Sequence, residues 1–143
     1  MKALSIRNPY AHFILCDEKT VECRSWMTDY RGDFLICSSA SPKVKDTICG
    51  YALCVARLES IEPFKKEHLE AACLGDMPEG KNYAWHLTNV RAIKPFAVKG
   101  KLNFFEVDDS LIEIIDNGDD SLTDAEADEL YRKHFEPLLY KGK

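Results

Sequence analysis

A stretch near the start of the chain, Lys19 to Trp26, carries the side chains best suited to chemistry. If this stretch is a strand, alternate side chains point the same way, so Glu22, Arg24 and Trp26 share one face. A carboxylate, a guanidinium and an indole in one row could hydrogen-bond a base edge or phosphate and stack a ring, as in proteins that grip single-stranded nucleic acids. The same row also suits a cross-strand ion pair beside a half-buried Trp. The spacing leaves both interpretations open.

A hydrolytic site could be built from the same stretch with one residue from elsewhere. Glu22 would be the general base, Lys19 and Arg24 would stabilise charge, and His86 would supply an acid. His86 also suits a structural role, because it follows Trp85 in an apolar run. The sequence shows no Ser-His-Asp spacing, Gly-rich phosphate loop or metal-ligand cluster, so we expect no cofactor and no metal.

The charge is divided unevenly along the chain, although the net charge is −5. Eleven Asp or Glu and no Lys or Arg lie between Glu106 and Glu129, while the rest of the chain holds 19 basic and 13 acidic residues. The stretch from Gly80 to Phe105 has five basic residues and no acid. We therefore expect a locally basic body that could bind an anion. The acidic stretch could be a solvated connector or could fold back toward the basic cleft.

The composition is that of a soluble globular domain: 45% hydrophobic, 30% charged and 143 residues long. The six cysteines are scattered, which favours neither a disulfide framework nor a metal knuckle. Apolar runs are too short for a membrane span, and Asn8, Pro9 and His12 interrupt the region where a signal peptide would be apolar. These features predict a cytoplasmic protein without membrane contact.

Hydrophobic patterning predicts about six short strands around two small helices, which suits a partly closed β-barrel of the α+β class. Asn8 is expected to cap the first helix, with Pro9 in its first turn. The predicted strands are residues 3–6, 20–26, 34–38, 51–58, 83–88, 92–96 and 103–107, and a second short helix is predicted over residues 67–74.

The C-terminal part carries the clearest local signal. Thr123 and Glu126 form a capping-box pattern ahead of apolar residues at helical spacing, so an amphipathic helix should begin near Asp124. Pro137 should kink or shorten that helix. We predict a domain over residues 1–107, with residues 108–143 forming an acidic connector and a C-terminal helix packed on the same domain.

Two blocks near the N-terminus resemble the signature of ASCH domains. They are Leu4-Ser5-Ile6-Arg7-Asn8-Pro9-Tyr10-Ala11 and Glu18-Lys19-Thr20-Val21-Glu22-Cys23-Arg24. Residues 83–87 and 98–107 are similar to the closing strands of the same family, so the resemblance covers roughly residues 1–107. It implies a small PUA-like β-barrel related to modules of RNA-modifying and translation-associated proteins.

The resemblance also implies where a ligand would bind. It would place Lys19, Glu22, Arg24, Trp85 and His86 around one cleft, with Arg7 and Tyr10 at its edge. Two positions depart from the family pattern.

One departure is Asp17, which stands where the family has Gly, and Asp tolerates the left-handed turn that Gly supplies. The other is Glu22, which stands where amidohydrolase members acting on acylated cytidine have a nucleophilic Thr.

Two functions follow as expectations. The first is a module that binds RNA, a nucleotide or a modified nucleoside in a basic cleft, with Lys19 and Arg24 on a phosphate or base edge and an aromatic ring of Tyr10, Trp26 or Trp85 against the base. The second is a hydrolase of a nucleobase or RNA phosphodiester, of the ribonuclease or amidohydrolase type, that uses Lys19, Glu22 and His86. The sequence leaves the enzymatic role, the oligomeric state and the ligand's identity open.

Overall fold

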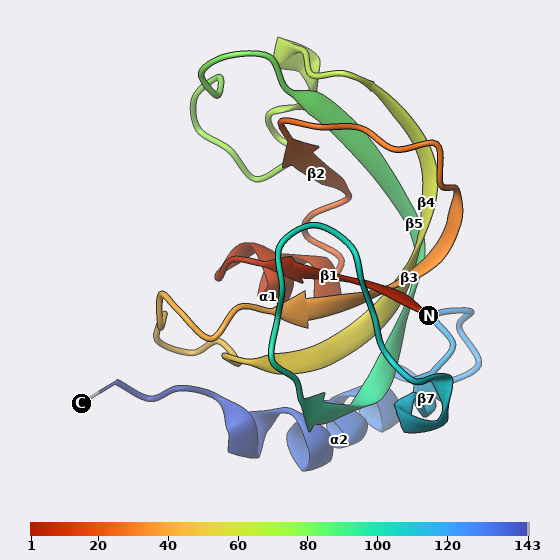
Figure 1. Ribbon diagram of the computed structural model, residues 1–143. Helices are drawn as coiled ribbons and strands as arrows, with labels where there is room; N and C mark the ends of the chain where they lie inside the picture. Colours follow the sequence, from red (N-terminus) through yellow and green to blue (C-terminus); the bar gives the residue numbers. More distant parts are fainter. Residues whose placement is uncertain (143) are drawn as a thin grey trace.

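The computed structural model describes residues 1–142 and shows one mixed sheet with helices against it (Figure 1). The sheet order is β2-β5-β4-β3-β1-β6, with β7 paired to β5. The strands pair antiparallel except for β1 and β3, which run parallel. Their bounds are β1 Lys2–Ile6, β2 Val21–Arg24, β3 Gly32–Ser38, β4 Tyr51–Pro63, β5 Tyr83–Ala97, β6 Phe105–Glu106 and β7 Ile114–Asp116. The predicted α+β fold, with a barrel that is only partly closed, is confirmed.

The two longest strands, β4 and β5, run the height of the molecule and curve strongly (Figure 1). The sequence predicted two strands where β5 is one. Asn89 explains this difference, because its left-handed backbone (φ 50°) bends the strand without ending it. Irregular pairing between Leu58 and Ser60, and at two further places along β4, adds to the curvature.

Helix α1, Tyr10–Leu15, lies inside this curve and buries Ala11 and Ile14 in the main core (Figure 1). The predicted Asn8 cap is wrong. Asn8 is buried, its amide NH2 donates to the Ile48 carbonyl (3.1 Å), and its Oδ1 accepts no N–H from the first turn of the helix. Tertiary contact has replaced a local cap, since a buried amide must find a partner.

The predicted helix over residues 67–74 is only partly present. A short 3-10 helix, η1, covers Lys66–His68 and is followed by turns. Ala72 and Leu74 remain important, because their segment covers β2 and β5 with a small apolar cluster.

The C-terminal helix α2, Asp124–His134, begins where it was predicted. Thr123 Oγ accepts the Glu126 N–H (3.1 Å), and Glu126 Oε1 accepts the Thr123 N–H (2.9 Å). The helix ends before Pro137, which lies in the 3-10 turn η3, Glu136–Leu138. Phe135 is buried in the main core, so this end of the chain contributes to it. A further 3-10 turn, η2, covers Asp109–Leu111. None of the helices within residues 1–142 has the length and apolarity needed to cross a membrane.

Candidate functional site

Lys19 is the least expected side chain of the site, because it is 2% exposed. Its ammonium donates to the Ala72 carbonyl (2.7 Å) and lies 3.4 Å from Glu22 Oε1. It also lies 5.2 Å from the centre of the Tyr10 ring, within cation–π range. Its own backbone is held by the Phe13 carbonyl (3.1 Å). A charge removed from water is costly unless it is paired in this way.

Glu22 lies between two cations. Its second oxygen, Oε2, is 2.9 Å from Arg24 Nε, and the Glu22 side chain is 8% exposed. The Arg24 Nε–H makes no hydrogen bond, so this contact with Glu22 is an ion pair only. Arg24 Nη2 donates a hydrogen bond to the Ser5 carbonyl (3.0 Å). Sequence alternation therefore placed Glu22 and Arg24 correctly on one face, with Lys19 beside them.

These side chains line a cavity of about 200 Å³, named here the Lys19 pocket. It is lined by Ser5, Ile6, Arg7, Tyr10, Lys19, Glu22, Cys23, Arg24 and Leu74. The aromatic ring available there is Tyr10. Three basic side chains and one acid thus surround a small space that opens to solvent.

A second, wider hollow of about 580 Å³ adjoins the Lys19 pocket and shares Ser5, Arg7 and Arg24 with it. We name it the basic groove. Its remaining lining is Ser39, Ala40, Ser41, Val98, Lys99, Gly100, Lys101, Leu102 and Asn103. With the shared Arg7 and Arg24, the whole groove is lined by four cationic side chains and by no carboxylate. The acidic stretch after Glu106 therefore does not line it.

A close backbone approach brings the lysines of the groove to β1. A Cβ built on Gly100 would lie 2.7 Å from Ser5 Oγ, which itself contacts Ser39 Oγ at 3.1 Å. Glycine therefore allows the Lys99–Lys101 turn to lie beside the strand whose Ser5 carbonyl holds Arg24.

The two tryptophans lie outside this site. Trp85 is fully buried, and its indole N–H donates to the Trp26 carbonyl (3.2 Å). Trp26 packs edge-on against Trp85 and Phe104, with ring centres 4.8 and 5.7 Å apart. Strand β2 ends at Arg24, so the alternation that was expected to carry Trp26 onto the Glu22 face does not extend that far.

His86 also lies away from Lys19 and Glu22. It pairs with Val21 across β2 and β5, whereas Glu22 pairs with Trp85, so His86 and Glu22 project from opposite faces. His86 Nε2 lies 2.7 Å from Glu62 Oε2, and His68 Nε2 lies 3.3 Å from the same oxygen. The hydrogen bond from His86 holds the pKa of Glu62 below its ordinary value.

Glu62, His68 and His86 have the donor atoms of a metal site, all within 4.8 Å of one another. Their hydrogen bonding favours a different interpretation. His68 Nδ1 accepts the Lys65 backbone N–H (2.9 Å), so the neutral ring carries its proton on Nε2 and donates it to Glu62. A metal at Nε2 would require the opposite tautomer.

We expect nitrogen NMR of His68 at neutral pH to show the Nε2–H tautomer, because Lys65 occupies the other nitrogen. A long-range ¹H–¹⁵N correlation spectrum reports the tautomer directly. The Nδ1–H form would contradict this hydrogen-bond pattern and would make the cluster a candidate metal site.

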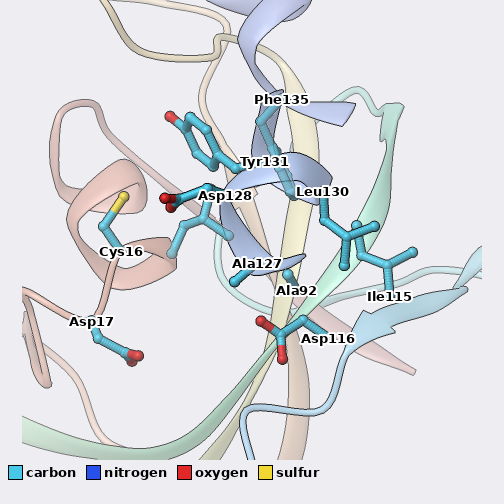
Figure 2. Close-up of a pocket in the computed structure, with 11 residues that line it drawn as sticks. Cys16, Asp17, Ala92, Ile115, Asp116, Ala127, Asp128, Leu130, Tyr131 and Phe135 are labelled. Atoms are coloured by element: carbon cyan, nitrogen blue, oxygen red, sulfur yellow. The ribbon is translucent and has the colours of Figure 1, made fainter. Parts of the chain in front are cut away.

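A third cavity, of about 540 Å³, lies between the end of α1, β7 and α2, and we name it the α2 cavity (Figure 2). Its apolar lining is Leu15, Cys16, Ala92, Ile115, Ala127, Leu130, Tyr131 and Phe135, and three carboxylates complete it, those of Asp17, Asp116 and Asp128. Burial raises the pKa of Tyr131 to about 12. Burial, followed by the nearby Asp116 charge, raises the pKa of Asp17.

Asp17→Asn is expected to stabilise the protein at neutral pH. A raised carboxyl pKa in the folded state disfavours the charged form, so the penalty is absent below the unfolded pKa near 3.8 and complete above the folded pKa. Asn also tolerates the left-handed backbone at this position (φ 61°).

Because Asp17 is exposed, screening limits the gain to about 0.5 kcal/mol, or about 1–2 °C in Tm. Thermal unfolding at pH 7 and pH 3 measures it. An equal gain at both pH values would show that the charge is not its cause.

Ser5, Ala72 and the Lys99–Lys101 turn are parts of the site that the sequence did not predict. The first two act through backbone carbonyls, which no side-chain pattern reveals. The turn lies within the basic stretch of residues 80–105, which was the one available signal.

Solved structures similar to this chain come from ASCH proteins of Zymomonas mobilis. The unmodified protein is 16% identical with a TM-score of 0.58, covering 99% of this chain and 97% of its own. A serine-to-alanine variant is 17% identical with a TM-score of 0.58, covering 78% and 96%. A tyrosine-to-phenylalanine variant is 15% identical with a TM-score of 0.56, covering 92% and 96%.

The structural similarity is at the level of the fold, and comparison with curated proteins gives no match. The sequence itself matches the ASCH domain over residues 4–97, which include Lys19, Glu22, Arg24 and most of the sheet. More than half of the chain is covered by that match. This chain therefore belongs to the ASCH domain family, whose fold is PUA-like.

Proposed function

We propose that this protein binds RNA or a nucleotide, with one base in the Lys19 pocket and the phosphates in the basic groove. The observation that carries the proposal is the continuity of the two hollows through Ser5, Arg7 and Arg24. The ASCH family to which the chain belongs is itself proposed to bind RNA.

The Lys19 pocket suits the base. Its volume of about 200 Å³ is below that of a typical drug-sized site, so it admits one planar group and excludes a folded duplex. Glu22 retains lone pairs that could accept from an exocyclic amine, and the Arg24 guanidinium retains donors for a base carbonyl. Tyr10 supplies a ring against which a base could pack.

The basic groove suits the phosphates. Arg7 is exposed, and among the described residues no carboxylate lies within 4 Å of it or of Lys99 and Lys101. Ser39 and Ser41 add hydroxyl donors. Unpaired cations release counterions when a phosphate binds, which is the main source of sequence-independent affinity for nucleic acids.

The alternative hydrolase is less well supported by the geometry. Both Glu22 oxygens are engaged by cations, and His86, the proposed acid, projects from the other face of the sheet. A general acid must lie within hydrogen-bond reach of the reacting group. The binding proposal needs only residues that line the two hollows.

Fluorescence anisotropy with a short labelled single-stranded RNA tests the proposal, with ATP as the competing nucleotide. We expect the RNA to bind, and we expect the logarithm of its association constant to fall linearly with the logarithm of the salt concentration. The slope should be about −1.5 to −3, since two to four phosphates would each contribute about −0.7.

If ATP displaces the RNA, the protein recognises a single nucleotide. If ATP does not displace the RNA, the protein recognises a longer stretch of the strand. Binding of neither ligand at low salt would refute the proposal.

A further inference from the structure

Leu102 is the most exposed large hydrophobic residue among residues 1–142, at 91% exposure. It lies in the turn after β5, next to Lys101 and near Lys99. We name residues 99–102 the KGKL turn. Its backbone is kept close to β1 by Gly100. An aliphatic side chain that follows two lysines in the sequence is thus presented to solvent on a short, anchored turn.

The α2 cavity has the complementary composition. Ala92, Ile115, Leu130 and Phe135 are among its apolar residues, and no Lys, Arg or His is among its lining residues. Figure 2 shows Asp17 on the α1 side and Asp116 on the β7 side, both with carboxylates turned toward the space between them. Asp128 provides a third negative charge from α2.

We propose that the KGKL turn of one copy of this protein docks in the α2 cavity of another copy. Leu102 would enter the apolar floor, while Lys99 and Lys101 would meet the carboxylates of Asp17, Asp116 and Asp128. Charge complementarity favours this occupant, because the turn carries two lysines and no acid, whereas the cavity lining carries three carboxylates and no cation. Burial raises the pKa of Asp17 and the nearby Asp116 charge raises it further, an effect that a docked lysine would oppose.

The resulting contact is head-to-tail. The cavity and the turn share no residues, so a pair retains one free turn on one copy and one free cavity on the other, and larger assemblies can form. One turn in one cavity buries far less than the roughly 1,600 Å² of a standard interface. We therefore expect weak association, with a Kd on the order of 0.1–1 mM.

The docking also excludes ligands from the basic groove. Lys99, Lys101 and Leu102 line that groove, so a copy whose turn is docked cannot use them on phosphates. Added RNA should dissociate the assemblies if the proposed function holds. Self-association without RNA does not depend on that function.

Two variants test the docking. Leu102→Ser removes the inserted side chain, and Ala127→Trp fills the cavity from α2. Sedimentation equilibrium of the whole protein from about 20 µM to 1 mM at low salt should show association of the parent and at least tenfold weaker association of each variant. A mixture of the two variants should form one-to-one dimers and nothing larger, because only one intact turn–cavity pair remains. Leu111→Ser, at another exposed leucine (55%), should associate like the parent.

A parent that stays monomeric up to 1 mM would overturn the proposal. So would association unchanged by Leu102→Ser, or a mixture of the two variants without dimers while the parent associates. If Ala127→Trp unfolds in thermal melts, Asp128→Lys serves as the cavity variant, since Asp128 is an exposed helix position. Its reversed charge should weaken association by a similar factor.

Discussion

Replacing Glu22 by Gln is expected to lower the free energy of unfolding by about 3 kcal/mol, because it leaves the buried Lys19 ammonium without a counter-charge. Lys19 is 2% exposed and would keep the Ala72 carbonyl, the Tyr10 ring and a neutral amide as partners, none of which carries a negative charge. Urea denaturation should show a lower midpoint with an unchanged m-value.

An exposed ion pair provides the matched control. Glu59 lies 3.4 Å from Arg57, with both side chains about half exposed, so Glu59→Gln should change stability by less than about 1 kcal/mol. Adding Lys19→Met to Glu22→Gln should recover part of the loss, since an apolar side chain then occupies the buried position. Equal losses for Glu22→Gln and Glu59→Gln would contradict the account of a buried pair.

The second large effect is on RNA binding. Arg7→Ala and Lys101→Ala are each expected to weaken binding about fivefold to tenfold at about 0.1 M salt and to reduce the salt slope by about one phosphate contact. Neither side chain makes a hydrogen bond or ion pair within the described residues, so the folded protein should lose little stability.

Arg132→Ala is the control for charge alone. Arg132 is an exposed arginine on α2, paired with Glu129 at 2.9 Å and absent from both hollows. Arg132→Ala changes the net charge by the same amount as Arg7→Ala or Lys101→Ala, but it should leave the RNA affinity within a factor of two of the parent's. If Arg132→Ala weakened binding as much as Arg7→Ala, the affinity would come from overall charge and the groove would have no special role.

Local patterns predicted those features that depend on a few consecutive residues. Alternation along β2 placed Glu22 and Arg24 together, and the Thr123–Glu126 pattern located the start of α2. Both patterns are set by geometry within a single element. The resemblance to ASCH domains agreed with the α+β class and partly closed barrel that the patterning predicted, and the observed curved sheet is not closed.

Features that depend on pairing between distant elements could not be predicted. The depth of Lys19 depends on the Ala72 carbonyl, 53 residues away. His86 was separated from Glu22 by register alone, since a shift of one residue between β2 and β5 moves a side chain to the other face. Trp85 was predicted to line a ligand cleft, but it lies in the core, where its indole N–H is satisfied by the Trp26 carbonyl.

The most direct measurement of the central claim is an amide ¹H–¹⁵N NMR titration of the protein with the short single-stranded RNA. The proposed site predicts shift changes within residues 5–10, 19–24 and 99–103, the segments that contribute most of the lining of the Lys19 pocket and the basic groove. The amide signals of residues 127–133 of α2 should not shift when the protein concentration is well below the self-association range. Changes confined to the Glu62–His68–His86 face or to the α2 cavity, or no changes at saturating RNA, would contradict the account.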